Sequence, residues 1–392
     1  MKEKPMILVD KPYVSKLLKD TIIKNNFPFA DLSEDKSFNF KNKSLSTKDA
    51  VSFIQKTKDF SIYTTSENTI GWINKNLDFT NLGEKIDLFK NKAKFRNLVK
   101  ENYPNYFFKE IKFANLFDTD LSEFEFPVIL KPSTGFFSMG VYKVPDKEKW
   151  PEVLSKLKNE IKHLENIYPP EVMATDSFIV EKEALGDEYA VDAYFDNNGK
   201  PVIVGIHKHL FSGDNDVSDR VYITSKEIIE ENIKEFTLFL EKTGKLAKIK
   251  NFPVHAELKK DKNNNIIPVE INPMRFGGWC STADMTYYSY KFNPYEYYFL
   301  NKKPDWNEIL KNKKDKIFSI IVLDNSTGVE TSKIKSFDHD KLLKGLSSVL
   351  EYRKIDYKIY PVFGFIFAES NKDKMEEIFY LLNSTLNEFI EV

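Results

Sequence analysis

The stretch Pro253–Trp279 reads PVHAELKKDKNNNIIPVEINPMRFGGW, and the rest of the chain is best interpreted around it. Two short runs in which apolar and polar residues alternate, Pro253–Leu258 and Ile266–Asn272, flank a polar segment with three successive asparagines. This pattern is typical of two strands joined by a solvated turn. The stretch therefore predicts a β-hairpin.

The predicted hairpin carries its charged residues at alternating positions. Because side chains on a strand alternate between faces, His255 and Glu257 share one face of the first strand, and Glu270 and Asn272 share one face of the second. If these faces coincide, two carboxylates and an amide oxygen converge, with Arg275 just beyond. Such hard oxygen ligands suit Mg²⁺. The alternative is a solvated hairpin whose charged side chains simply face water.

Composition limits the possible functions. A chain of 392 residues fits two to four domains, and its net charge of -1 recommends neither nucleic acid nor an anionic membrane as a partner. The single cysteine, Cys280, excludes an internal disulfide framework and a multi-cysteine metal site. No apolar run has the length of a signal peptide or a membrane span, so we expect a soluble cytoplasmic protein.

The amino-terminal part alternates strands and helices. Met6–Val9 is a buried type of strand, and the helical spacing of Tyr13–Asn25 follows it; Phe60–Thr64 is a second strand, leading into the amphipathic run Thr69–Leu77. This alternation predicts a parallel sheet with ligands at the carboxyl ends of its strands. No GxGxxG motif follows either strand, and we interpret Ser66 as a helix cap.

A basic helix is predicted over Leu88–Lys100, with the sequence LFKNKAKFRNLVK. Its cations Lys92, Lys94 and Arg96 are interpreted by default as a solvated face.

A second motif follows the strand Phe126–Leu130. Lys131 ends this strand and precedes a loop rich in Ser, Thr and Gly, Ser133–Gly140, which leads back into the strand Val141–Val144. Such a loop offers backbone N–H groups and hydroxyls to phosphate oxygens, and the lysine adds a point charge. The motif is not a P-loop, since the lysine precedes the glycines, and a plain hairpin turn is the alternative.

The remaining pattern predicts further helices and strands. In the middle of the chain these are helix Glu152–Tyr168, strands Ser177–Glu181, Tyr189–Phe195 and Pro201–His207 in an antiparallel sheet, and helix Lys226–Lys245. In the carboxy-terminal part they are strand Ile317–Leu323, helix Asp340–Leu350, strands near Tyr357–Phe367 and helix Lys372–Phe389.

Three motifs in this order resemble the ATP-grasp superfamily, in its carboxylate–amine or thiol ligase branch. They are FPVILKPSTGFFSMGV, FIVEKEALGDEYAVD and VHAELKKDKNNNIIPVEINPMRFGG. Each is weak alone, but three in the right order are a strong signal. The resemblance implies an α+β (α/β) ATP-grasp fold, with a Rossmann-like domain at 1–87, an ATP-grasp domain at 88–303 and a small carboxy-terminal α/β unit at 304–392.

The resemblance also implies roles for individual residues. Lys131 and Lys92, with Lys94 as a fallback, are similar to the lysines that reach the phosphates, and the 133–140 loop would close over the triphosphate. The implied nucleotide-binding residues are Lys92, Lys131, Ser133, Ser138, Glu181, Lys182, Ala184 and Glu188, of which Lys182 and Ala184 would read adenine through backbone groups and Glu188 would hold the ribose. The implied metal ligands are Glu257, Glu270 and Asn272, and the implied catalytic residues are Arg275 and Lys131.

The chain departs from the family pattern at two places. Phe136 and Phe137 stand where relatives place smaller residues, and one extra residue separates Asn272 from Arg275.

Four further residues are candidates for the substrate side of the site. His255 is about as suited to contacting the substrate as to a structural role. For Trp279, Arg220 and His209 a structural role is favoured.

The resemblance implies an ATP-dependent ligase that joins a carboxylate to an amine through an acyl phosphate and releases ADP and phosphate. ATP and Mg²⁺, or Mn²⁺ in its place, would be the cofactors, amino-acid-like compounds the substrates, and a homodimer a possible assembly. Two rivals remain: a biotin-carboxylase-like enzyme that phosphorylates bicarbonate, and a non-catalytic ATP-binding scaffold or sensor. The complete set of candidate ligands argues against the scaffold.

Overall fold

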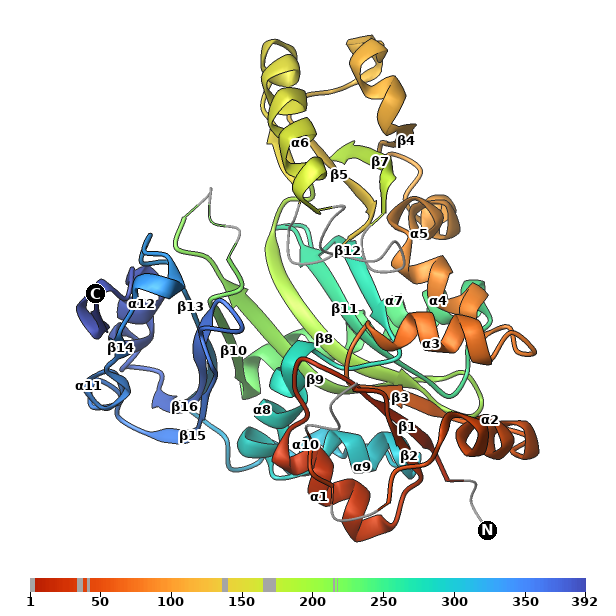
Figure 1. Cartoon of the computed structure of the whole chain (residues 1–392), viewed down its shortest axis with the longest axis vertical. Helices are drawn as coiled ribbons and strands as arrows, with labels where there is room; N and C mark the ends of the chain where they lie inside the picture. The colour runs from red at the N-terminus through yellow and green to blue at the C-terminus, as the bar shows by residue number, and fades with distance from the viewer. Residues whose placement is uncertain are drawn as a thin grey trace.

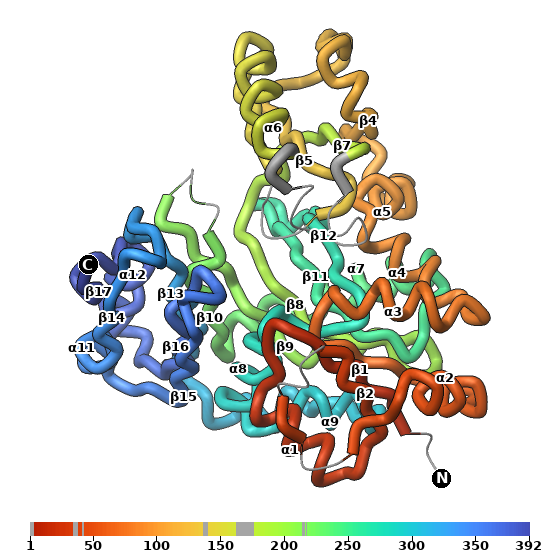
Figure 2. Tube along the Cα trace, in the orientation of Figure 1, coloured from red at the N-terminus to blue at the C-terminus, as the bar shows by residue number. Residues whose placement is uncertain are grey.

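The computed structural model describes residues 4–33, 38–40, 43–135, 140–164, 174–213, 216 and 218–392. The amino-terminal part lies at the lower right of Figure 1, a small lobe of four strands stands at the top, and the carboxy-terminal part lies at the left. Figure 2 shows the same arrangement along the Cα trace. A large antiparallel sheet lies between these three parts and carries the hairpin of the candidate site.

The amino-terminal part is a parallel sheet flanked by helices, as the alternation predicts. Its strands have the order β2-β1-β3, with β1 at Met6–Val9, β2 at Phe29–Asp31 and β3 at Ile62–Thr64. Its helices are α1 (Lys16–Asn25), α2 (Thr47–Lys56) and α3 (Thr69–Asn76). The three residues of β2 form too short a run for its pattern to be recognised. Asn68 stands directly before α3 but its side chain makes no capping hydrogen bond, whereas the hydroxyl of Ser66 accepts a 3.2 Å hydrogen bond from the backbone N–H of Asn68 at the start of the helix.

The predicted helix over Leu88–Lys100 is two helices. They are α4 (Leu82–Lys90) and α5 (Lys92–Val99), and Asn91 separates them. The Asn91 side chain accepts a hydrogen bond of 2.9 Å from the backbone N–H of Lys94 and so caps α5. The break turns α5 so that Lys92 and Arg96 become buried, whereas Lys94 stays exposed.

The small lobe has a sheet and a hydrophobic core of its own. Its strands are β4 (Phe108–Lys112), β5 (Val128–Thr134), β6 (Tyr142–Val144) and β7 (Ala174–Lys182), in the order β4-β7-β5-β6. Helix α6 (Trp150–Leu164) covers this sheet, with Trp150, Leu154 and Leu157 buried in the core of the lobe.

The large sheet has eight strands in the order β12-β11-β8-β9-β10-β13-β16-β15. The strands are β8 (Asp187–Phe195), β9 (Pro201–Leu210), β10 (Val221–Ser225), β11 (Phe252–Lys260), β12 (Ile266–Pro273), β13 (Lys316–Asp324), β15 (Val349–Lys354) and β16 (Val362–Asn371). The accompanying helices are α7 (Lys226–Ala247), α8 (Ser281–Tyr290), α9 (Pro294–Phe299) and α10 (Trp306–Ile309).

The hairpin of β11 and β12 pairs in a register that meets the condition for a shared site. Glu257 lies opposite Glu270, and His255 lies opposite Asn272. The two faces that carry these side chains therefore coincide.

The carboxy-terminal prediction is wrong in two places. The expected helix Asp340–Leu350 is only the short α11 (His339–Leu343), and the chain then enters β15, which pairs with β16. The expected helix Lys372–Phe389 shortens to α12 (Glu376–Asn383), and β17 (Ile390–Glu391) pairs with β14 (Ser336–Phe337). In the first place the pairing of β15 with the next strand, β16, overrides the local helical spacing.

The large sheet also runs across residue 304. Strands β13, β16 and β15 extend the same sheet that holds the hairpin, although this end of the molecule has a separate hydrophobic cluster around Ile321, Phe363 and Ile366. The domain boundaries at 87 and 303 stay predictions. No helix among the described residues is both long and apolar enough to cross a membrane.

Candidate active site

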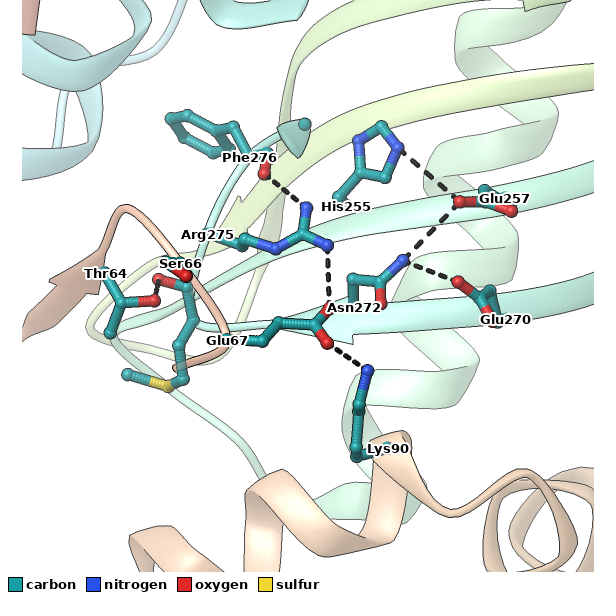
Figure 3. Close-up of polar contacts among 12 residues, drawn as sticks. Thr64, Ser66, Glu67, Lys90, His255, Glu257, Glu270, Asn272, Arg275 and Phe276 are labelled. Atoms are coloured by element: carbon teal, nitrogen blue, oxygen red, sulfur yellow. Dashed lines mark hydrogen bonds and ion pairs between the residues drawn. The ribbon is translucent and has the colours of Figure 1, made fainter. Parts of the chain in front are cut away.

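Two carboxylates and an amide meet on the hairpin face (Figure 3). The side-chain N–H₂ of Asn272 donates to Glu270 at 2.8 Å and to Glu257 at 3.5 Å. Burial raises the pKa of Glu257 well above its usual range, and the nearby charge of Glu270 raises it further. Burial would also raise the pKa of Glu270, but the ammonium groups of Lys92, 3.0 Å away, and of Lys90 together outweigh burial and lower it.

This donor set fits a magnesium ion. Among the described residues no three or more His, Cys, Asp or Glu side chains are grouped so as to hold a metal by themselves. Mg²⁺ needs no such group, since it usually takes one or two carboxylates and completes its octahedron with phosphate oxygens and water. Glu257 and Glu270 are half-buried carboxylates side by side, and a divalent cation would offset their mutual repulsion.

Lys92 links the hairpin to the loop that follows β5. Besides Glu270, its ammonium contacts the carbonyl oxygen of Gly135 at 3.2 Å. The interpretation of Lys92 as part of a solvated face is thus wrong, because the side chain is buried between two elements. Lys94 is exposed and pairs with Asp87, as a solvated residue would.

A second charged group lies in the small lobe. Glu181 on β7 receives Lys131 from β5 on one carboxylate oxygen and Arg96 from α5 on the other, each at 2.7 Å. Burial alone would raise the pKa of Glu181, but Arg96 and Lys131 hold it at about 2. Arg96 is therefore not part of a solvated face, and its partner is Glu181, one of the residues that the resemblance implies for nucleotide binding.

Arg275 reaches a carboxylate that the sequence did not single out (Figure 3). Its guanidinium lies 2.7 Å from Glu67, directly after β3, and Lys90 pairs with the other oxygen of the same carboxylate. Burial would raise the pKa of Glu67, but Lys90 and Arg275 lower it to about 2. The available signal was position, because polar residues at the carboxyl end of a parallel strand face the ligand edge.

The extra residue before Arg275 is absorbed locally. Met274 has a left-handed backbone (φ 69°), and its N–H donates to the carbonyl of Pro253 at 2.8 Å. Arg275 consequently still reaches Glu67. The other departure, Phe136 and Phe137, lies outside the described residues.

Three more residues that the resemblance implies for nucleotide binding are Ser133, Lys182 and Ser138. Ser133 is buried and contacts Glu110 and Ser177, at 3.2 and 3.1 Å. The N–H of Lys182 donates to Phe107 in the strand pairing, and its carbonyl accepts a 2.6 Å hydrogen bond from the Tyr106 hydroxyl. Ser138 lies outside the described residues.

Ala184 and Glu188 lie beyond the end of β7. Ala184 is half-buried in the loop before β8. Glu188 lies 3.2 Å from His209 and 3.6 Å from Lys259. Burial would raise the pKa of Glu188, but these two partners lower it.

The imidazole of His255 contacts the buried carboxylate of Asp192. Its Nδ1 lies 2.7 Å from Asp192 on β8, and its Nε2 lies 3.9 Å from Glu257. The alternation along β8 places Asp192 on the same face as Glu188, which was the sequence signal for it.

The other three candidates on the substrate side make structural contacts. Arg220 binds Asp324 and the carbonyls of Leu381 and Ser384, all within the carboxy-terminal part. His209 also contacts the Ser218 carbonyl at 2.9 Å. The ring of Trp279 packs against Tyr13, Tyr360 and Phe365.

Comparison with known proteins identifies the fold. The family described as the ATP-grasp domain matches residues 124–283. No curated protein sequence matches significantly. The solved structure of an L-amino acid ligase from Bacillus licheniformis is similar over 99% of this chain and 98% of that chain, with 17% identity and a TM-score of 0.68.

Two other solved structures share this arrangement. N5-carboxyaminoimidazole ribonucleotide synthetase from Thermotoga maritima is 13% identical and covers 96% of both chains, with a TM-score of 0.65. A biotin carboxylase from Campylobacter jejuni is 12% identical over 94% of this chain and 88% of that chain, with a TM-score of 0.61. The chain therefore contains an ATP-grasp domain at residues 124–283 and has an α+β ATP-grasp fold.

Proposed function

We propose that this chain is an ATP-dependent ligase that joins a carboxylate to an amine and releases ADP and phosphate. One observation carries the proposal. Next to the paired carboxylates and amide of the β11–β12 hairpin lies Lys92 of α5, which pairs with Glu270, and just after β12 lies Arg275, which pairs with Glu67. A site of this composition can hold a triphosphate and its metal, and then stabilise charge on the transferring phosphoryl group.

The proposed roles follow from this arrangement and from the motif resemblance. Mg²⁺, or Mn²⁺ in its place, would be held by Glu257, Glu270 and Asn272. Lys131 and Lys92 would bind phosphate oxygens, helped by Ser133 and Ser138. Glu181 would hold Lys131 in place, backbone groups of Lys182 and Ala184 would read adenine, and Glu188 would bind the ribose. Arg275 would contact the acyl phosphate.

The chemistry proceeds in two displacements. An oxygen of the substrate carboxylate attacks the γ-phosphorus, so that a new O–P bond forms while the bond from that phosphorus to ADP breaks. The amine nitrogen then attacks the acyl carbon, a C–N bond forms, phosphate leaves and the nitrogen loses a proton. When bound, the metal would neutralise phosphate charge.

The residues of the chain supply positions and charges. Each of Lys92, Lys131 and Arg275 is fixed by a carboxylate partner at 2.7 to 3.0 Å, so little reorganisation is needed when charge develops. Solved structures of similar fold include a ligase of amino acids, which supports amino-acid-like substrates.

The test measures nucleotide turnover against a panel of amino acids and small carboxylic acids. With hydroxylamine in place of the amine, we expect a hydroxamate to form in proportion to ADP. Chromatography that shows AMP as the product would overturn the acyl-phosphate mechanism.

Two further outcomes decide against the ligase. ADP release stimulated by bicarbonate alone would favour the bicarbonate-phosphorylating enzyme. MgATP binding without turnover against the whole panel would favour the scaffold or sensor.

A further inference from the structure

The segment Met274–Cys280, here called the arginine turn, carries Arg275 in an unusual backbone conformation. Met274, Trp279 and Cys280 have φ values of 69°, 57° and 57°, in the left-handed region that residues with a Cβ rarely adopt. Three such residues within seven persist only where the surrounding structure holds them. The question is which contacts hold the turn.

The first anchor of the arginine turn is Asp192, on the neighbouring strand β8. Its side chain is almost fully buried and accepts hydrogen bonds from the backbone N–H of Gly277 at 3.0 Å and from the hydroxyl of Thr282 at 2.5 Å. The fit is tight, because a Cβ on Gly277 would lie 2.1 Å from the Thr282 hydroxyl. The same carboxylate contacts His255. One buried group therefore links the arginine turn to the hairpin face that carries the proposed metal ligands.

The second anchor is Arg353, on β15 at the far end of the large sheet. Its guanidinium donates to the carbonyl of Trp279 at 3.1 Å and forms a buried ion pair with Asp284. It also lies over the ring of Phe367, 4.4 Å from the centroid. Arg353 lies outside residues 124–283, the part of the chain that matches the ATP-grasp domain.

The amino-terminal end of the arginine turn is fixed by backbone hydrogen bonds and by the Thr64 hydroxyl, which donates to the Met274 carbonyl at 3.4 Å. The Met274 N–H donates to Pro253 and its carbonyl accepts from the N–H of Thr64, both at 2.8 Å. Arg275 follows directly. Its side chain is thus aimed by a backbone that is anchored before it by strands and after it by Asp192 and Arg353.

We propose that Asp192 and Arg353 are positioning residues for Arg275, which hold the arginine turn so that the guanidinium faces the reacting groups. This inference rests on the proposed function. It gives the carboxy-terminal part a role in the reaction without any nucleotide contact. A displacement of about 1 Å in such a group lowers the rate by as much as about 10²-fold, so loosening either anchor should lower kcat.

The main test is Arg353→Lys, which keeps the charge beside Asp284 but shortens the reach to the Trp279 carbonyl. We expect kcat to fall about 10-fold to 10²-fold while KM for ATP stays within about twofold. Arg220→Lys is the matched control, because Arg220 is equally buried but contacts Asp324, Leu381 and Ser384 instead of the turn. Equal losses of kcat in the two variants would overturn the proposal.

A double-mutant cycle separates positioning from a general loss of structure. If Arg353 acts through Arg275, Arg353→Lys should cause no further loss of kcat in an Arg275→Ala background. Independent, multiplicative losses would overturn the proposal.

Hydrogen exchange tests the anchors without any substrate. In Asp192→Ala the Gly277 amide should exchange faster than in the wild type, while amides in the core of β13 keep their protection. Unchanged exchange at Gly277 would show that Asp192 does not hold the turn. If the wild type forms ADP with no substrate of the panel, the proposed function fails, and this exchange measurement still decides whether the anchors hold.

Discussion

The ammonium nitrogen of Lys131 lies 2.7 Å from a carboxylate oxygen of Glu181, across the paired strands β5 and β7. The two residues are diagonal neighbours in the register, since Ile129 lies opposite Glu181 and Lys131 lies opposite Ile179. Arg96 binds the other oxygen. One buried carboxylate therefore neutralises only one of two buried cations. The remaining positive charge would attract a phosphate group.

Removing Lys131 should abolish most turnover. Lys131→Ala takes away charge that would stabilise the transferring phosphoryl group, and it leaves Glu181 paired with Arg96, so the fold should survive. We expect kcat/KM for ATP to fall about 10²-fold to 10³-fold, measured as ADP release. Lys109→Ala in the same lobe is the control, because Lys109 is half-buried and pairs with the exposed Glu123. Near-normal rates in folded Lys131→Ala would refute the assignment.

Glu270→Gln should change the metal requirement. The substitution keeps the size of the side chain but removes the charge that a divalent cation would need, and it leaves Lys92 without its ion pair. We expect turnover to be lost at millimolar Mg²⁺, and any residual activity to require at least about 10-fold more metal. Glu241→Gln, on the outer face of α7, should titrate like the wild type. An unchanged Mg²⁺ titration in Glu270→Gln would show that Glu270 is not a ligand.

Much of this site could be predicted because its residues lie on one local hairpin. The alternation along 253–272 predicts which side chains share a face, and the register that pairs Glu257 with Glu270 confirms it. Strand β15 and the short α11 could not be predicted in the same way. Their local spacing is helical, and the antiparallel pairing of β15 with β16, the next strand of the large sheet, decides otherwise.

The same limit applies to Glu67, Arg96 and Asp192. Each meets its partner across many residues of sequence: Glu67 meets Arg275, Arg96 meets Glu181, and Asp192 meets Gly277. A charged residue looks solvated until the element that buries it is known. Ion pairs between distant elements therefore need the fold first.

Arg220 should matter for stability rather than for substrate binding. Arg220→Met leaves Asp324 and the carbonyls of Leu381 and Ser384 without their donor. Because the Asp324 side chain is 36% exposed, losing this donor costs about 1–3 kcal/mol, which urea unfolding would detect. The exposed Lys311→Met should cost under about 0.5 kcal/mol. If KM for ATP or the carboxylate rises while the free energy of unfolding is unchanged, Arg220 belongs to the site after all.

The last prediction concerns acid stability and Glu181. The pKa of this carboxyl is about 2 in the folded chain against an ordinary value of 4.5, because Arg96 and Lys131 outweigh its burial. The unfolded chain therefore takes up a proton below pH 4.5, whereas the folded chain does so only near pH 2. Glu181 thus contributes stability that is fully present above about pH 5 and is lost as the pH falls from there toward 2, on the order of 3 kcal/mol. The side chain at position 181 cannot titrate in Glu181→Gln, and this variant is less stable at pH 7 because Lys131 and Arg96 lose their charge partner.

The difference in unfolding free energy between the wild type and Glu181→Gln should consequently shrink between pH 5 and pH 3 in urea titrations. Other carboxyls such as Glu67 are present in both proteins and cancel in this difference. A difference that stays constant over this range would mean that the Glu181 pKa is not lowered and that its ion pairs do not stabilise the fold.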